Sequence, residues 1–173
     1  VRGKEFVDNR NERGFNELRG YFIDEGGFLS SMDQPAEVSV LEQGPLFVKV
    51  AVKGKIGKYS FTQTIRLTQG EPRIDMSVKL DWTGNPRIGE PGIEFRADNP
   101  RKAFYDDRYK LLVYLPTQIA NQQIYKDAPF DVCESRLENT FFNRWDSIKH
   151  NIILNWVDVA SKDNSCGLSL FTD

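Results

Sequence analysis

The sequence is poor in the residues from which most metal and redox sites are built. Its 173 residues include one histidine and two cysteines. A catalytic zinc ion normally takes three protein ligands from His, Asp, Glu and Cys, and two of its commonest ligand sets use at least two histidines. We therefore expect no metal site and no catalytic residue in this chain. Cys133 and Cys166 are too few to define a disulfide framework, and they could form one bridge or stay free.

Long apolar runs and an excess of charge of one sign are also missing. No stretch approaches the roughly 18 apolar residues that a membrane-spanning helix needs. The 23 basic and 25 acidic residues are interspersed and give a net charge of -2, so no basic stripe is present to bind a phosphate backbone. We expect neither nucleic acid nor a membrane as a partner. The chain opens with Val1-Arg2-Gly3-Lys4, without a starting Met or a signal peptide, and we expect it to be part of a longer protein whose compartment stays open.

The clearest pattern that is present runs from Tyr59 to Trp82. Tyr59, Phe61, Ile65 and Leu67 share one parity of the first arm, and Gln69-Gly70-Glu71-Pro72 supplies a tight turn. The apolar parity of the second arm is formed by Ile74, Met76, Val78, Leu80 and Trp82. Alternation with a period of two predicts an antiparallel hairpin with one apolar face. Two strands are marginal alone, so the rest of the chain must supply an opposing sheet.

Shorter segments of similar character predict further strands. We expect the charge run Asp8-Asn9-Arg10-Asn11-Glu12-Arg13 to be a solvated loop or edge. Phe15, Leu18, Tyr21 and Phe22 have loosely helical spacing, but glycines make this window too short for a stable helix. We expect residues 126–147 to be mostly loop, with one helical turn near 136–139. The predicted strands cover residues 37–42, 46–53, 93–97, 109–115, 118–125, 151–159 and 167–171, with Leu46, Val48, Val50, Val52, Leu111 and Val113 directed inward. The fold class predicted for residues 1–173 is therefore a single all-β domain, a large antiparallel β-sandwich.

Candidate functional residues are few. Asp75 and Asp81 share a strand face, but six residues separate them by roughly 20 Å, too far for a glycosidase pair. Trp82 and Trp156 lie on apolar parities and are most simply core residues. Trp145, on a predicted loop, is compatible with either a loop anchor or a ligand contact. We take it, with the neighbouring Asp146 and the lone His150, as the candidate substrate-binding set.

The ordered series of motifs resembles the C-terminal domain of glycoside hydrolase family 38, the α-mannosidases. The central likeness is a Q-x-I-x-L strand followed by an R-I-D strand that ends in D-W, here residues 63–67 and 72–82. Weaker similarities precede and follow it in the same order. They are Gly3-Lys4-Glu5-Phe6-Val7, Glu42-Gln43-Gly44-Pro45-Leu46, Leu112-Val113-Tyr114-Leu115-Pro116, Trp145-Asp146 and Gly167-Leu168-Ser169-Leu170-Phe171-Thr172-Asp173.

The resemblance implies a β-sandwich of the galactose-mutarotase-like supersandwich kind, located after a catalytic α/β domain and a helical bundle. In that family the zinc ligands and the nucleophilic aspartate belong to the catalytic domain, and no position here matches their motifs. The implied parent enzyme is a zinc-dependent, retaining hydrolase of terminal α-mannosides. The implied partners of this chain are the catalytic and helical domains of the same polypeptide and, through the full enzyme, mannose-containing glycans.

Three hypotheses follow for the chain itself. As a structural lobe, it would bind no sugar and would show an apolar patch where another domain docks. As a carbohydrate-binding module, it would present Trp145 or another aromatic residue on a wet, concave face. As an independent mutarotase-like enzyme, it would need His150 facing an acid in a pocket.

Overall fold

The computed structural model describes residues 3–89, 109–135 and 153–172. Contacts divide the chain into two compact units. Unit 1 comprises Val1–Phe15, Gly92–Asp106 and Leu115–Asp173, and unit 2 comprises Asn16–Pro91 and Asp107–Tyr114. The expectation of one domain over residues 1–173 stays a prediction.

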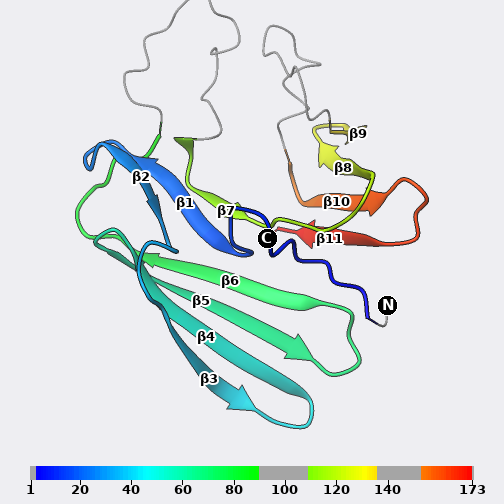
Figure 1. Ribbon diagram of the computed structural model, residues 1–173, viewed down its shortest axis with the longest axis horizontal. Coiled ribbons are helices and arrows are strands. Elements are labelled where there is room, and N and C mark those ends of the chain that lie inside the picture. Colours follow the sequence, from blue (N-terminus) through cyan, green and yellow to red (C-terminus); the bar gives the residue numbers. More distant parts are fainter. Residues whose placement is uncertain (1–2, 90–108, 136–152, 173) are drawn as a thin grey trace, which may run out of the picture. The chain divides into compact units, whose positions relative to one another are not determined.

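The largest sheet of unit 2 is a four-stranded antiparallel meander (Figure 1). Its strands are β3 (Glu37–Gln43), β4 (Phe47–Ile56), β5 (Tyr59–Thr68) and β6 (Ile74–Asp81). The turns after β4 and β5 contain Gly57 and Gly70, which adopt positive φ of 59° and 80°. This conformation is readily available to glycine and is strained for other residues. The strands predicted at residues 37–42 and 46–53 and the Tyr59 to Trp82 hairpin are thus confirmed.

The second sheet of unit 2 has the order β2-β1-β7. Its strands are β1 (Glu17–Phe22), β2 (Gly27–Ser30) and β7 (Leu112–Tyr114). The charge run at residues 8–13 contains no strand, in agreement with the expected loop, but the β1–β2 hairpin was not predicted. Two features hid it: Glu17 is a buried charged residue whose carboxylate accepts a 2.6 Å hydrogen bond from Ser30, and Gly20 looks like a breaker. A Cβ on Gly20 would lie 3.1 Å from the Cα of Leu111, so glycine permits close approach of the backbones here.

The two sheets of unit 2 enclose an apolar core. Its buried members are Leu18, Phe22, Ile56, Tyr59 and Phe61, from β1, β4 and β5. Flanking side chains that are partly buried complete the cluster: Leu29, Val52, Leu80, Ile88 and Leu111. The core therefore covers only the end of the meander that carries the β4–β5 turn.

Several residues predicted to face inward are exposed. Leu46 and Val113 are largely exposed, and Leu67, Ile74 and Val78 are also exposed, although their parity on the meander is the predicted one. Leu111, in contrast, packs against the core as predicted. Parity was correct for the hairpin, but it does not reveal whether a face is covered.

Unit 1 contains a four-stranded antiparallel sheet of order β11-β10-β8-β9. Its strands are β8 (Gln122–Ala128), β9 (Asp131–Glu134), β10 (Trp156–Ser161) and β11 (Gly167–Phe171). The last strand was predicted with its exact bounds. β8 and β10 lie several residues later than expected, and β9 falls in a segment predicted to be mostly loop, so that expectation is wrong there.

Asp127 explains why β10 begins where it does. The carboxylate of Asp127 accepts backbone hydrogen bonds from Leu154, Asn155 and Trp156 at 2.9–3.2 Å. Partial desolvation opposes ionisation of Asp127, but the hydrogen bonds from Trp156 and Asn155 outweigh it and lower the pKa. These donors hold the chain that enters β10 against the end of β8.

All strand pairs in the described residues are antiparallel, which confirms the predicted all-β, antiparallel sandwich class. The expected strand at 93–97 and the expected helical turn near 136–139 lie outside the described residues. Cys133, which is buried, and Cys166, which is half-buried, are not joined by a disulfide.

Candidate functional site

The three residues predicted to contact substrate, Trp145, Asp146 and His150, lie outside the described residues. They stay predictions. Within the described part of the chain, no group of three or more His, Cys, Asp or Glu side chains could hold a metal ion. The polar groups that do converge lie elsewhere, in unit 2.

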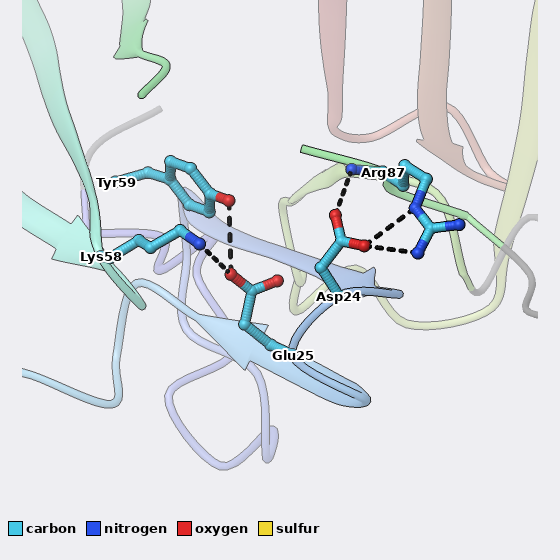
Figure 2. Close-up of polar contacts among 5 residues, drawn as sticks. All are labelled: Asp24, Glu25, Lys58, Tyr59 and Arg87. Atoms are coloured by element: carbon cyan, nitrogen blue, oxygen red, sulfur yellow. Dashed lines mark hydrogen bonds and ion pairs between the residues drawn. The ribbon is translucent and has the colours of Figure 1, made fainter. Parts of the chain in front are cut away.

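The convergent group is centred on the turn between β1 and β2, which contains Asp24 and Glu25 (Figure 2). The carboxylate of Asp24 accepts hydrogen bonds from Nε and Nη2 of Arg87 at 2.8 and 2.6 Å. It also accepts one from the backbone N–H of Arg87 at 3.2 Å. These hydrogen bonds hold the pKa of Asp24 below its ordinary value and raise that of Arg87.

Backbone contacts reinforce the position of Arg87. Its carbonyl accepts a 2.9 Å hydrogen bond from the N–H of Ile23, and Ile88 forms an antiparallel bridge with Phe22. The segment that follows β6 is thereby added to the end of β1. Arg87 is consequently fixed by its backbone as well as by its side chain.

Glu25 points to the other side of the same turn, toward the turn between β4 and β5 (Figure 2). Its Oε1 lies 2.9 Å from Nζ of Lys58 and accepts a 3.3 Å hydrogen bond from the hydroxyl of Tyr59. The hydrogen bond to Glu25 is the main reason that the pKa of Lys58 is raised. Lys58 also lies 5.2 Å from the ring centroid of Tyr59, within the range of a cation–π contact.

Trp82 directly follows the end of β6, on the β6 side of the hairpin that β6 forms with β5, and Tyr59 is the first residue of β5. Its ring centroid is 5.2 Å from that of Tyr59 in an edge arrangement and 6.4 Å from that of Phe22. Yet Trp82 is 42% exposed, whereas Tyr59 and Phe22 are fully buried. The interpretation of Trp82 as a core residue is therefore only half right: one side of the indole packs on the core, and the rest is accessible to solvent.

We call Trp82, Glu25, Lys58 and Arg87 the Trp82 edge, with Asp24 and Tyr59 as its supports. Sequence reasoning missed it, because its members come from three separate segments of the chain. A catalytic general acid needs a pKa raised toward the working pH. Asp24 has the opposite shift, and Glu25 is paired with a cation. The arrangement thus suits binding or support better than proton transfer.

A shallow groove of about 520 Å³ also lies on unit 2. It is formed by β3, β4, β5 and the segment before β3, and it is lined by Pro35, Gly54 and Phe61 together with the polar residues Gln34, Glu37, Lys53, Lys55, Ser60 and Thr62. Its charges are of both signs.

In unit 1 the most distinctive group is the thiol of Cys166, which lies 2.6 Å from Nζ of Lys4. Donation from Lys4, and secondarily from Ser161, lowers the pKa of the thiol. The adjoining turn carries Asp163, whose pKa falls to about 2 because Ser161 and Ser165 donate hydrogen bonds to its carboxylate. Lys4 and Ser161 therefore favour the thiolate form of Cys166, which is the reactive form of a cysteine. The only histidine of the chain, His150, lies outside the described residues.

Comparisons with known proteins bear on what these surfaces serve. No helix among the described residues has the length and apolar character needed to cross a membrane. No curated protein and no solved structure matched the chain. Residues 21–173 match the family described as the glycosyl hydrolases family 38 C-terminal domain. This match covers all eleven strands except the first four residues of β1, and it agrees with the ordered motifs. The chain therefore belongs to the family of glycosyl hydrolase family 38 C-terminal domains.

Proposed function

We propose that the chain is the non-catalytic β-sandwich portion of an α-mannosidase and that its meander packs against another domain of the same polypeptide. Membership in the family supports a non-catalytic domain of a family 38 enzyme and implies other domains in that polypeptide. Hydrolysis of α-mannosides by the complete enzyme, and the packing itself, belong to the proposal. The zinc ion and the catalytic aspartate would be supplied by the catalytic domain, as the resemblance implies.

The observation that carries the packing proposal is an apolar face on the meander that extends beyond the core. Cross-strand register places its side chains in three rows across β3 to β6, which are Val38-Val52-Gln63-Val78, Val40-Val50-Ile65-Met76 and Val48-Leu67-Ile74. In the first row Val52 packs against the core and Gln63 is buried, so the uncovered surface is formed by the ends of this row and by the other two rows. Val40 is 58% exposed and Val78 is 39% exposed. A contiguous apolar surface of this kind is typical of a protein interface.

The test compares two substitutions at adjacent positions of β6. Val78 lies on the apolar face and Ser77 on the opposite, polar face, and both are exposed. In the complete polypeptide, Val78→Asp is expected to destabilise the interface by about 2 kcal/mol or more, because it buries an unpaired carboxylate. Ser77→Asp is expected to stay within about 0.5 kcal/mol, as surface substitutions usually do. Urea unfolding and hydrolysis of an aryl α-mannoside are measured on both.

The same two variants of the 173-residue chain alone provide the control. There Val78→Asp is expected to be nearly neutral, because the side chain is already exposed. If Val78→Asp and Ser77→Asp behave alike in the complete polypeptide, the packing proposal is wrong. If the complete wild-type polypeptide with added zinc hydrolyses no α-mannoside, the assignment as part of an α-mannosidase is wrong.

A further inference from the structure

We propose that the outer edge of β3 joins two copies of this chain into a dimer, with the two β3 strands paired antiparallel about Ser39. This goes beyond the proposed function, which concerns the apolar face of the meander and not its edge. The proposal depends on three features of β3: backbone groups without a partner, a stretch without charge, and a sequence that is complementary to itself.

β3 is an outer strand of the meander, and among the described residues it pairs with β4 alone (Figure 1). The turn between β4 and β5 has two residues, so the strand pair that closes it is hydrogen-bonded, and hydrogen-bonded pairs alternate with other pairs from there. In this alternation Ala51 directs its backbone groups to β3, where its partner is Ser39. The neighbours Val38 and Val40 consequently direct their N–H and C=O groups away from β4, where no hydrogen bond joins them to the described part of the chain.

The side chains of β3 leave this edge unprotected. Val38, Val40 and Leu41 are all exposed, and the stretch from Val38 to Leu41 carries no charge. β6, the outer strand on the other side of the meander, carries three charged side chains, and all three form ion pairs. Proteins commonly protect an edge strand with charges, because an open row of backbone groups can pair with a second strand. The edge of β3 lacks this protection and is suited to pairing.

The sequence of β3 is complementary to itself under a two-fold axis through Ser39. This axis places Val38 of each copy opposite Val40 of the other, and these are the residues whose backbone groups are open. Each such pair can exchange N–H to C=O hydrogen bonds in both directions. The two copies of Ser39 lie opposite each other on the axis, as a pair that needs no backbone hydrogen bond and whose Cα atoms approach to about 4.5 Å. An axis perpendicular to the sheet also keeps the apolar faces of both copies on one side.

The position of the axis follows from the irregularities at the two ends of β3. An axis at Val40 would bring the register shift near the end of β3 into the centre of the contact and set Val38 against Glu42. An axis at Val38 would require pairing by Ala36, which lies before the start of β3. Association about Ser39 is symmetric and closed, so it ends at two copies. The contact is short, and we expect a dissociation constant on the order of 100 µM, since small interfaces are typically weak.

The test introduces charge at the axis. Ser39→Lys and Ser39→Asp each place like charges directly opposite one another in a homodimer, which destabilises a strand pair. We expect either variant alone to raise the dissociation constant of the 173-residue chain about fivefold or more. An equimolar mixture of the two should return it to about the wild-type value, because opposite charges then face each other. Sedimentation equilibrium from about 10 to 500 µM measures the average mass. A variant that fails to fold cannot be rescued by mixing, so the mixture also controls for folding.

Ser77 provides the matched control. It is a serine in the same cross-strand row and on the same face as Ser39, but it belongs to β6, at the other side of the meander. Ser77→Lys and Ser77→Asp should therefore leave the dissociation constant unchanged.

The proposal is overturned if the wild-type chain stays monomeric over the whole concentration range. It is also overturned if the mixed Ser39 variants associate no better than either variant alone, or if the Ser77 variants have the same effect. Hydrogen exchange of the complete polypeptide adds a further outcome. Protection of the Val38 and Val40 amides at a concentration where the polypeptide is monomeric would show that a strand of another domain occupies this edge, which also excludes the dimer. The packing proposal is tested separately at Val78 and does not depend on these results.

Discussion

Removal of Phe22 is the sharpest test of the core. Phe22 is 0% exposed, it stacks on Tyr59 with ring centroids 5.5 Å apart, and it contacts Trp82. Truncation of a buried phenylalanine to alanine typically costs about 3–5 kcal/mol, because apolar contacts are lost and a cavity is left. We therefore expect Phe22→Ala to lower the free energy of unfolding of unit 2 by an amount in this range.

Phe28 offers a matched control on the same hairpin, because it loses the same atoms but lies on the outer face of the sheet. It is 38% exposed, and it contacts Tyr21 and the guanidinium of Arg19. Its truncation should cost about 1–2 kcal/mol, since part of the ring is already in water and only surface contacts are lost. Urea unfolding followed by tryptophan fluorescence measures both variants. Equal losses, or a larger loss for Phe28→Ala, would refute the assignment of β1 to the core.

Three further predictions concern turns and titratable groups. Gly70→Ala should lower the free energy of unfolding by about 1–2 kcal/mol through the positive φ of this residue alone. Gly57→Ala should lower it more, because the new Cβ would also lie 2.6 Å from Cδ1 of Leu29. Urea midpoints that reverse this order would contradict the prediction. Asp163 has a pKa of about 2, below the ordinary 3.8, so its stabilising contribution is full above pH 3.8 and is lost toward pH 2. The difference in unfolding free energy between wild type and Asp163→Asn should therefore vanish as the pH falls through this window, and a difference independent of pH would exclude the effect. Lys4→Met should slow alkylation of Cys166 by iodoacetamide near neutral pH, as followed by peptide mass spectrometry, and an unchanged rate would show that Lys4 does not favour the thiolate.

The meander could be predicted because each local signal agreed with the others. Strict alternation identified the faces of β5 and β6, and Gly70 in the turn has the positive φ that such a reversal requires. The β1–β2 hairpin could not be predicted by the same rules. Its buried Glu17 is satisfied by Ser30, and its Gly20 serves close packing, so a charge and a glycine that interrupt any apolar alternation belong to a sheet.

The Trp82 edge was beyond the reach of sequence patterns for a different reason. Asp24 and Arg87 are 63 residues apart, and Glu25 and Tyr59 are 34 residues apart. Nothing local in either segment specifies its partner, because the distances close only when β1 and β2 pack on the meander. The predicted candidates Trp145, Asp146 and His150 remain untested.

The exposed face of the meander shows what periodicity measures. Phe61 and Leu80 form one cross-strand pair and lie in or against the core, whereas Leu67 and Ile74 form the last pair on the same face and are both exposed. Alternation shows which face of the hairpin is apolar, and this face is the same along the whole hairpin. The contact that covers Phe61 and Leu80 lies within unit 2. The pattern persists where unit 2 provides no such cover, as the proposed packing requires, and the substitutions at Val78 and Ser77 test whether this face contacts another domain of the enzyme.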